Sequence, residues 1–409
     1  MAGLTIVGAS QAGLQLACSL RELGWREPVT LVGAEPHPPY ARPPLSKAFL
    51  TASGHPSGLA FRDEQFYSTL DIELILGETV EKVEIEAGRA LLGSGRELAF
   101  DRLALATGAR PRPLPIPGAE LDGVLVLRGL DDALALRARL AASPDVVVIG
   151  GGFVGLEVAG TAAALGSRTT VLELGPALMG RAVSAPTAAF VQTFHAERGV
   201  AVRTGTRPVR VLGADGRVTG VELAGGEVVP AGVVVVGIGV APADELARSA
   251  GLECDNGIVV DEFSRASDGV TLAVGDCANV PDPSPVEGPR ARLRLESVDN
   301  AVEQARAAAT TVVGAARPYR GVPWFWSDQA GAKLQIAGLA TPADEAVVRP
   351  GRAGRQVVLR YRGAVLVAAE CVNSPAEFLS ARKALAAGRG LARERAEEPG
   401  SLKDLLAAR

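Results

Sequence analysis

The stretch at residues 146–157 reads VVVIGGGFVGLE, and residues 4–13 near the start of the chain read LTIVGASQAG. In both, a short apolar strand leads into a glycine-rich turn that opens a helix. In such a βαβ unit the first glycine makes a tight turn, the second lets the backbone approach a pyrophosphate, and the third lets the helix pack on the strand. The helix N-terminus then stabilises the phosphate charge. Two copies in one chain therefore predict two dinucleotide sites.

An acidic residue closes the strand that follows each turn. Glu35 comes after the apolar residues 29–32, and Glu173 comes after residues 170–172. A carboxylate at this place accepts hydrogen bonds from the ribose hydroxyls of a bound nucleotide. Glu173 also repels a 2′-phosphate, and the next two residues supply no cation to offset that repulsion. The second site is therefore expected to favour NADH over NADPH.

The composition excludes several classes of protein. With 409 residues the chain is long enough for two or three domains, and its 47% hydrophobic and 22% charged content is ordinary for a globular protein. A formal net charge of -4 argues against a nucleic-acid-binding protein. The apolar N-terminal stretch contains the first glycine turn, so it is interpreted as a buried strand rather than a signal peptide. The apolar run at 233–241 is too short to cross a bilayer and predicts a buried parallel strand. We expect a cytoplasmic protein with no nucleic-acid or membrane partner.

The cysteines and histidines are scattered along the chain. Four cysteines without a CxxC pair and three histidines, His37, His55 and His195, do not form a cluster with the spacing of metal ligands. We therefore expect no metal site. The chain also lacks the dithiol that a disulfide reductase places beside its redox cofactor.

Prolines divide the chain. Four prolines between residues 111 and 117 follow the first unit, and Pro318 and Pro323 open the C-terminal part. The expected elements between and after these boundaries are strands at 102–107, 270–274, 356–361 and 364–369, helices at 131–142 and 297–313, and a charged helical tail. The sequence predicts an α/β fold with two Rossmann-like dinucleotide-binding domains plus an α+β C-terminal domain.

Six segments have a distinctive sequence. They are Arg42-Pro-Pro-Leu-Ser-Lys47, Ala106-Thr-Gly108, Gly150-Gly-Gly-Phe-Val-Gly-Leu-Glu157, Gly275-Asp-Cys-Ala278, Arg294-Leu-Glu-Ser-Val-Asp-Asn300 and Trp324-Phe-Trp-Ser-Asp-Gln329. On these segments the whole chain resembles the FAD-containing, NADH-dependent ferredoxin reductases of bacterial oxygenase systems, the family of putidaredoxin reductase, rhodocoxin reductase and the reductases of biphenyl and toluene dioxygenases.

The resemblance implies a glutathione-reductase-like flavoprotein with three domains. Residues 1–112 and 242–316 would form a discontinuous FAD-binding domain, and residues 113–241 an inserted NADH-binding domain. Residues 317–409 would form the C-terminal domain, which covers the flavin and contributes to ferredoxin docking.

The resemblance also assigns residues to each site. The FAD contacts it implies are Gly8, Ser10, Ala12, Gly13, Glu35, Arg42, Lys47, Val80, Thr107, Gly108, Arg128, Asp276 and Val298. The NADH contacts it implies are Gly150, Gly152, Phe153, Gly155, Glu173, Arg181, Gly237, Ile238 and Gly239. Catalytic roles near the reacting rings are implied for Lys47, Glu157, Glu296 and Trp326. We expect Phe325 to pack in the core, and a helix after Asp276 to direct the N–H groups of Cys277 and Ala278 at the flavin.

The implied activity is that of a ferredoxin–NAD⁺ reductase. Electrons would pass from NADH through FAD to a [2Fe–2S] ferredoxin that feeds a cytochrome P-450 type monooxygenase or an aromatic-ring dioxygenase. The ferredoxin is expected to be acidic and to dock transiently on a basic rim, whose candidate residues are Arg306, Lys333, Arg382 and Lys403, with Arg290, Arg292 and Arg294 nearby. The protein is expected to be a monomer or a weak homodimer.

Alternatives stay open at this point. They are an NADH-sensing flavoprotein of the apoptosis-inducing-factor type, a rubredoxin reductase and a nitrite-reductase-type flavin module. Three positions also depart from the family pattern. Ser10 replaces the middle glycine of the first turn, and Ala41 stands where an acidic residue often precedes Arg-Pro-Pro. Val298 stands where dioxygenase reductases usually have tryptophan and putidaredoxin reductase has valine, which favours a partner of the putidaredoxin type.

Overall fold

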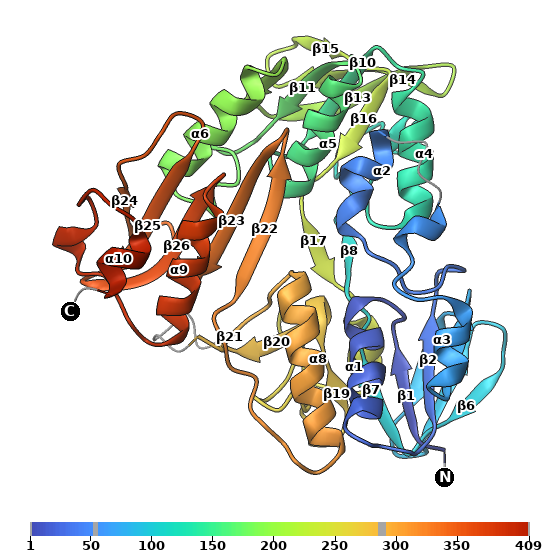
Figure 1. Ribbon diagram of the computed structural model, residues 1–409. Helices are drawn as coiled ribbons and strands as arrows, with labels where there is room; N and C mark the ends of the chain where they lie inside the picture. Colours follow the sequence, from blue (N-terminus) through green and yellow to red (C-terminus); the bar gives the residue numbers. More distant parts are fainter. Residues whose placement is uncertain (1, 52–55, 285–291, 408–409) are drawn as a thin grey trace.

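The computed structural model describes residues 2–51, 56–284 and 292–407. Figure 1 shows two units built on parallel sheets, one above the other, with an antiparallel sheet beside them. Arg290 and His55 lie outside the described residues.

The first parallel sheet has the strand order β19-β7-β1-β2-β3. Its strands are β1 (Leu4–Val7), β2 (Val29–Gly33), β3 (Ile72–Leu76), β7 (Arg102–Leu105) and β19 (Leu272–Ala273). All residues of β1 and β2 are buried, as expected for parallel strands covered on both faces. Helices α1 (Gln11–Glu22) and α8 (Val298–Val312) pack side by side against this sheet. Because β19 and α8 come from the later part of the chain, this unit is assembled from two separate segments.

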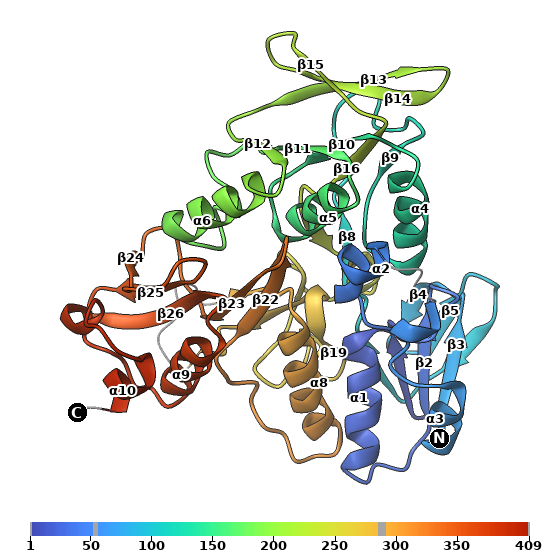
Figure 2. The same cartoon turned by 45° about the horizontal axis from the view of Figure 1, so that its top comes forward.

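The second parallel sheet has the order β12-β11-β10-β16-β9. Its strands are β9 (Val124–Leu125), β10 (Asp145–Ile149), β11 (Arg168–Leu172), β12 (Val200–Arg203) and β16 (Val233–Val236). The helices of this unit are α4 (Leu130–Leu140), α5 (Phe153–Ala164) and α6 (Ala185–Ala196). α5 packs on β10 and β11, and also against strand β22 (Trp324–Gln329) and the short helix η1 (Pro43–Ser46). Figure 2 shows α5 where the three parts of the chain converge.

The C-terminal sheet is antiparallel, with the order β22-β23-β26-β25-β24. Its strands are β22 (Trp324–Gln329), β23 (Ala332–Gly338), β24 (Glu345–Val348), β25 (Gln356–Arg362) and β26 (Val365–Val372). Helix α9 (Pro375–Ala386) packs on β23 and β26, and α10 (Leu402–Ala407) packs on α9. One face of the sheet thus meets its own helices, while α5 and α6 of the second unit contact its strands.

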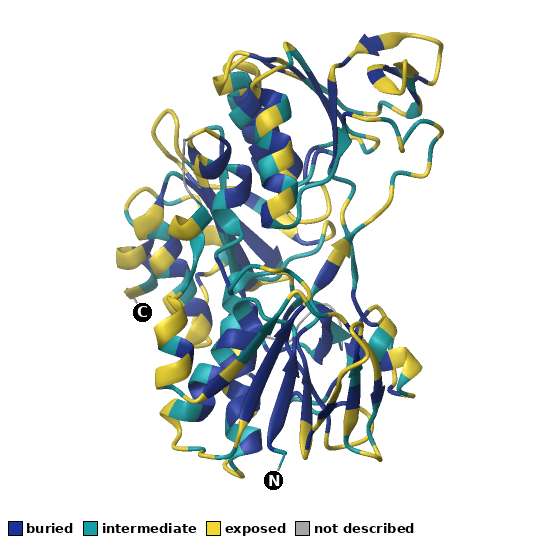
Figure 3. Cartoon of the chain, turned by 90° about the vertical axis from the view of Figure 1, so that its right-hand side faces the viewer, coloured by how far each residue is buried: buried dark blue, intermediate teal, exposed yellow. Residues whose placement is uncertain are grey.

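Smaller elements connect these sheets. The minor strands are β4 (Val80–Glu84), β5 (Arg89–Leu92), β6 (Glu97–Ala99), β8 (Ala109–Pro111), β13 (Pro208–Ala214), β14 (Arg217–Leu223), β15 (Val228–Pro230), β17 (Val240–Pro242), β18 (Ile258–Val259), β20 (Ala278–Pro281) and β21 (Arg292–Leu293). The short helices are η1 (Pro43–Ser46), α2 (Ala48–Thr51), η2 (Pro56–Leu59), α3 (Glu64–Thr69), α7 (Glu245–Ser249), η3 (Gly275–Cys277) and η4 (Arg393–Arg395). β8 and β17 pair with each other where the chain crosses between the two units, visible as the narrow connection in Figure 3.

Two local expectations from the sequence are wrong. The apolar run 233–241 is not one strand, because β16 ends at Val236 and the chain turns through Gly239, whose φ of +97° takes it out of the sheet before β17 begins. The segment after Asp276 is not a helix start either. It is one turn of 3₁₀ helix, η3, after which Ala278 begins strand β20.

The described residues contain no helix that combines the length and the apolar character needed to span a bilayer. Within the same residues, no group of three or more His, Cys, Asp or Glu side chains is arranged to hold a metal ion.

Candidate functional site

The two glycine turns have the same local geometry. Gly8 has a φ of +120° and Gly150 a φ of +107°, a region that favours glycine. A Cβ atom added to Gly8 would lie 2.1 Å from the carbonyl oxygen of Ala106, and one added to Gly150 would lie 2.4 Å from that of Gly237. Each turn is therefore packed so closely against the neighbouring strand end that a side chain would displace it.

The helices that follow the turns begin without side-chain caps. Ser10 is the N-cap residue of α1 and Gly152 that of α5, and neither makes a side-chain capping hydrogen bond. The first N–H groups of both helices thus remain available to an anion. A Cβ atom at Gly13 or Gly155 would lie within 2.1 or 2.5 Å of the carbonyl oxygen of Gly8 or Gly150. The third glycine of each turn therefore sets how closely the helix packs.

A cavity of about 910 Å³ opens beside the first turn, large for a small-molecule site. The residues with implied FAD or catalytic roles that line it are Gly8, Ser10, Ala12, Glu35, Arg42, Lys47, Val80, Thr107, Gly108, Arg128, Glu157, Asp276, Glu296, Val298 and Trp326. Gly13 does not line the cavity and lies beneath the turn. Phe153, an implied NADH contact, lines this same cavity.

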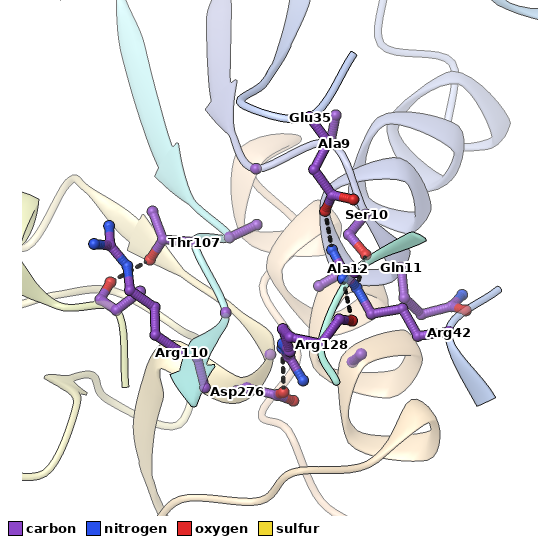
Figure 4. A pocket seen from close by; sticks show the side chains of 18 of the residues that line it. Ala9, Ser10, Gln11, Ala12, Glu35, Arg42, Thr107, Arg110, Arg128 and Asp276 are labelled. Carbon is purple, nitrogen blue, oxygen red and sulfur yellow. Dashed lines mark hydrogen bonds and ion pairs between the residues drawn. The ribbon is translucent and has the colours of Figure 1, made fainter. Parts of the chain in front are cut away.

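Ion pairs hold the cavity wall together, as Figure 4 shows. The Arg42 guanidinium lies 2.5 Å from Glu35, whose other oxygen accepts a 2.5 Å hydrogen bond from the Tyr40 hydroxyl. Arg128 pairs with Asp276 at 3.1 Å. Burial alone would raise the pKa of Glu35, but the charge of Arg42 and the hydrogen bonds from Tyr40 and Arg42 outweigh it and leave that pKa below its usual value. Glu35 is therefore an ionised acceptor near neutral pH.

The depressed pKa of Glu35 predicts a pH-dependent contribution to stability. A carboxyl whose pKa is lower in the folded state stabilises the fold at pH values above its ordinary pKa of 4.5, and this contribution is lost as the pH falls through the folded value. We expect Glu35→Gln to lower the thermal unfolding midpoint at neutral pH, and the gap to the wild type to shrink below about pH 4.5. Thermal unfolding followed by circular dichroism at several pH values measures it. A gap that stays constant into the acid range would contradict this assignment.

Glu157 is the buried acid of the site. It lies on α5, one turn from the glycine turn, and its carboxylate is 2.9 Å from the Lys47 ammonium. The Ser46 hydroxyl donates to it at 2.5 Å, and the Ser327 hydroxyl of β22 donates to its other oxygen. Thr161, further along α5, donates to the carbonyl oxygen of Ser46 at 2.9 Å. The loop of the first unit and the C-terminal sheet therefore meet on one face of α5.

Aromatic side chains form the C-terminal wall of the cavity. Trp326 lines it and stacks on Trp324 at a centroid distance of 5.4 Å. Phe325 also lines the cavity and packs against Phe153 at 4.5 Å, so the expectation that it belongs to the core is wrong. Glu296 is exposed at the rim and pairs with Arg294 at 2.7 Å.

The second turn collects most of the residues implied for the pyridine nucleotide. Gly237 lies against Gly150 and donates its N–H to Ile149 at 2.8 Å, which places the 237–239 loop beside the turn. The Glu173 carboxylate accepts hydrogen bonds from the N–H groups of Gly151 at 2.7 Å and Gly175 at 2.6 Å. Arg181 is exposed on the loop between β11 and α6. The carboxylate thus stands at the end of β11, directly beside the turn.

The residues present fit two nucleotide cofactors. Each turn offers an uncapped helix N-terminus, a first and a third glycine too closely packed for a Cβ atom, and a carboxylate after the next strand. FAD fits the first turn, because the large cavity continues from it to Lys47 and Trp326. NADH fits the second, which opens toward the same cavity through Phe153 and Glu157.

The basic residues expected at the docking rim lie on four elements: Arg306 on α8, Lys333 on β23, Arg382 on α9 and Lys403 on α10. Lys333 stands opposite Asp328 in the register of β22 and β23, and Arg382 lies over the ring of Trp324 at the other end of β22. Arg306 on α8 pairs with Glu303 at 2.6 Å, and Arg382 lies 3.7 Å from Asp299.

Sequence reasoning missed several residues that the structure brings to the site. They are Tyr40, Ser46, Arg110, Ser327, Gln329 and, behind them, His195. A signal existed for three of them, because Ser46 lies within the Arg42–Lys47 segment, and Ser327 and Gln329 lie within the Trp324–Gln329 segment. His195 carried no signal, since its partner is 134 residues away in the chain.

Comparisons with known proteins agree with this geometry. The family described as pyridine nucleotide-disulphide oxidoreductase matches residues 3–305, and the reductase C-terminal family matches residues 324–406. Rhodocoxin reductase of Rhodococcus erythropolis is 44% identical over 97% of this chain and 92% of its own length. The ferredoxin reductase for the CYP199A2 system from Rhodopseudomonas palustris is 40% identical, with a TM-score of 0.95 and complete coverage of both chains. The reductase in the covalent putidaredoxin reductase–putidaredoxin complex is 36% identical, with a TM-score of 0.94 over 99% of this chain and 98% of that one.

Proposed function

We propose, since the chain belongs to the pyridine nucleotide-disulphide oxidoreductase family and carries a reductase C-terminal domain, that it is the NADH-dependent reductase of a bacterial oxygenase system. It is an oxidoreductase that binds FAD and NAD(H). It passes electrons from NADH through FAD to a [2Fe–2S] ferredoxin, which feeds a cytochrome P-450 type monooxygenase or an aromatic-ring dioxygenase.

One observation carries this proposal. Helix α5 opens at the second glycine turn, and its first turns contribute Phe153, Val154 and Glu157 to the cavity beside the first glycine turn. A nucleotide on the second turn therefore has its reactive end directed into the cavity that fits FAD. Bound FAD supplies the chemistry, because it takes two electrons with a hydride and releases them singly to an iron–sulfur acceptor.

The chain's own residues orient the reactants and exclude water. Phe153, Phe325 and Trp326 supply apolar walls to the cavity, while the Lys47 ammonium is held by Glu157 at its polar side. The structure leaves all four cysteines as free thiols, so electrons leave without a disulfide step. An external acceptor is needed, and a small ferredoxin of opposite charge to a basic rim meets that need.

We further propose the domain division 1–112 with 242–316 for FAD, 113–241 for NADH, and 317–409 for the covering domain. The late segment that supplies β19 and α8 to the first sheet supports it. We also propose that the protein works in the cytoplasm, where four free thiols stay reduced.

Rapid mixing of the purified protein with NADH and with NADPH tests the proposal. Bleaching of the flavin absorbance by NADH, followed by cytochrome c reduction that depends on an added [2Fe–2S] ferredoxin, is the expected result. Colourless protein, or flavin that NADH does not reduce, would contradict it. Turnover with rubredoxin alone would favour the rubredoxin-reductase alternative, and a long-lived reduced complex with no turnover would favour an NADH-sensing role.

The position of Glu173 predicts coenzyme preference. Its carboxylate is fixed by the N–H groups of Gly151 and Gly175, at the place where a 2′-phosphate would approach. We expect Glu173→Arg to lower kcat/KM for NADH by about 100-fold, because the two N–H donors lose their acceptor. The kcat/KM for NADPH should fall less than that for NADH, because the new cation attracts the 2′-phosphate. Steady-state kinetics with both coenzymes measure this.

Glu197→Arg is the matched control for that variant. Glu197 is an exposed glutamate of the same unit at the end of α6, so the substitution changes the net charge equally. It should leave both kcat/KM values within about twofold of the wild type. An equal fall for both coenzymes in Glu173→Arg would mean that Glu173 does not discriminate between them.

A further inference from the structure

Three donors converge on the buried Glu157 carboxylate. Ser327 donates to Oε1, whereas Ser46 and the Lys47 ammonium both lie against Oε2, at 2.5 and 2.9 Å. Ser46 and Lys47 belong to the segment beside the cavity, but Ser327 belongs to strand β22 of the C-terminal sheet. Oε1 is therefore held by the C-terminal domain, while Oε2 faces Ser46 and Lys47.

A second layer fixes Ser327. The side-chain amide of Gln329 uses its nitrogen to donate to Ser327 Oγ at 2.7 Å and to the carbonyl oxygen of Phe153 at 3.2 Å. Its oxygen lies 2.9 Å from Nε2 of His195. Because both hydrogens of the amide are engaged elsewhere, the oxygen accepts, and His195 Nε2 carries the proton.

His195 ends this chain of hydrogen bonds in the interior. It is fully buried near the end of α6, and no described residue partners its Nδ1. Burial lowers the pKa of His195, so the ring is neutral and carries one proton. The ring does not line the cavity and reaches the site only through Gln329 and Ser327.

The direction of these hydrogen bonds matters for Glu157. With the proton on Nδ1, His195 Nε2 would be an acceptor, and the Gln329 amide would turn to meet it. Its oxygen would then face Ser327, whose single proton could not serve both Gln329 and Glu157. In a buried site an oxygen facing another oxygen without a shared proton is costly. The network therefore has one favourable arrangement, in which the protons shared between His195, Gln329 and Ser327 all point toward the carboxylate.

We propose that Ser327, Gln329 and His195 are positioning residues, which fix the Glu157 carboxylate and so hold the Lys47 ammonium at the wall where the two cofactors meet. This inference rests on the proposed function. It also explains how the C-terminal domain, which has no glycine turn, affects the geometry of the reaction. Ser327 and Gln329 of β22, with His195 of α6, hold Glu157 on the side away from Lys47.

Histidine NMR tests the proton arrangement without an activity assay. The chain has three histidines, so a protein with ¹⁵N-labelled histidine gives a spectrum that His195→Gln assigns by difference. We expect the wild-type holoprotein to hold His195 as the neutral Nε2–H tautomer, and Gln329→Met, which removes the acceptor, to lose that preference. A wild-type Nδ1–H tautomer would overturn the proposal.

Rapid-reaction kinetics test the positioning. For Ser327→Ala, Gln329→Met and His195→Leu we expect the rate constant of flavin reduction at saturating NADH to fall about tenfold, with the Kd for NADH changed less than about threefold. His195→Gln keeps a donor at the place of Nε2 and should retain most of the rate. Ser374→Ala is the matched control, because Ser374 is a buried serine of the same domain whose hydroxyl donates to the carbonyl oxygen of Val372.

The outcomes separate this inference from the proposed function. Failure of the wild type to be reduced by NADH removes the proposed function itself. A wild type that is reduced normally, with the three variants no slower than Ser374→Ala or with His195→Gln as slow as His195→Leu, overturns the positioning role alone. Thermal midpoints of the holoproteins identify any variant that is merely unfolded, and the tautomer measurement on the wild type decides the matter in that case.

Discussion

The Gly150→Val variant should purify with FAD bound and yet be reduced by NADH at least about 100-fold more slowly than the wild type. Gly150 has a φ of +107°, and a Cβ atom there would lie 2.4 Å from the carbonyl oxygen of Gly237. A β-branched side chain must therefore push the turn away from the 237–239 loop, and the N-terminus of α5 moves with it. The first glycine turn, Glu35 and Arg42 lie on other elements of the cavity wall, so FAD should still bind although α5 shifts.

The absorbance spectrum and stopped-flow reduction measure this separation directly. Dithionite, which needs no binding site, should bleach the flavin of the variant as it does that of the wild type. Gly166→Val is the control, because Gly166 also has a positive φ, +93°, but a Cβ atom there meets nothing within 4 Å. It imposes backbone strain in the same unit without the collision. Loss of FAD from Gly150→Val alone would place FAD, rather than NADH, at the second turn.

The two glycine turns could be found in the sequence because their chemistry is local. Strand, turn and helix follow one another within about a dozen residues. The first glycine of each turn packs against the end of the neighbouring strand in the sheet, and the third packs against the turn itself. The same holds for Glu35 and Glu173, which end the following strands. These local sequence patterns therefore predict the fold class, and the resemblance along the whole chain predicts the family and the activity.

Other features depend on contacts that no local pattern reveals. The run 233–241 is uniformly apolar, and only its position against the Gly150 turn explains why it breaks at Gly237. Likewise, Asp276 was expected before a helix, whereas Gly275 turns the chain into η3 and then into β20. The partners of Glu157 come from two separate parts of the chain, Ser46 and Lys47 from one and Ser327 from the other. Such contacts are fixed by domain packing, so the distinctive segments mark Ser46, Lys47 and Ser327 without showing that all three meet at Glu157.

A second buried carboxylate ties the C-terminal sheet to the second unit. Glu370 of β26 lies 2.6 Å from Arg360, and the two side chains are only 1% and 4% exposed. Glu370 also accepts from the N–H of Ser184 at 2.9 Å and from its hydroxyl at 2.6 Å, at the N-cap of α6. Helix α6 is thus held at its start by Glu370 and near its end by the hydrogen bond of His195 to Gln329.

The largest loss of stability is therefore expected from Glu370→Leu. It leaves the Arg360 guanidinium buried without its counter-charge and the N-cap of α6 without its acceptor, which costs about 3–5 kcal/mol. The thermal unfolding midpoint of the holoprotein should fall by roughly 5 °C or more, measured by circular dichroism and by release of flavin fluorescence. Because α6 also carries His195, we expect flavin reduction by NADH to slow in this variant while it is still folded.

Burial, rather than ion-pair geometry, should decide the size of this effect. Arg203 and Glu227 form a pair of the same 2.6 Å length on the surface, where the side chains are 35% and 58% exposed, so Glu227→Leu should change the midpoint by no more than about 2 °C. The double variant Arg360→Met/Glu370→Leu should recover part of the loss, because it removes the unpaired charge. Recovery stays incomplete, since the N–H of Ser184 still lacks an acceptor. Equal shifts for Glu370→Leu and Glu227→Leu would show that the buried pair does not join the two units.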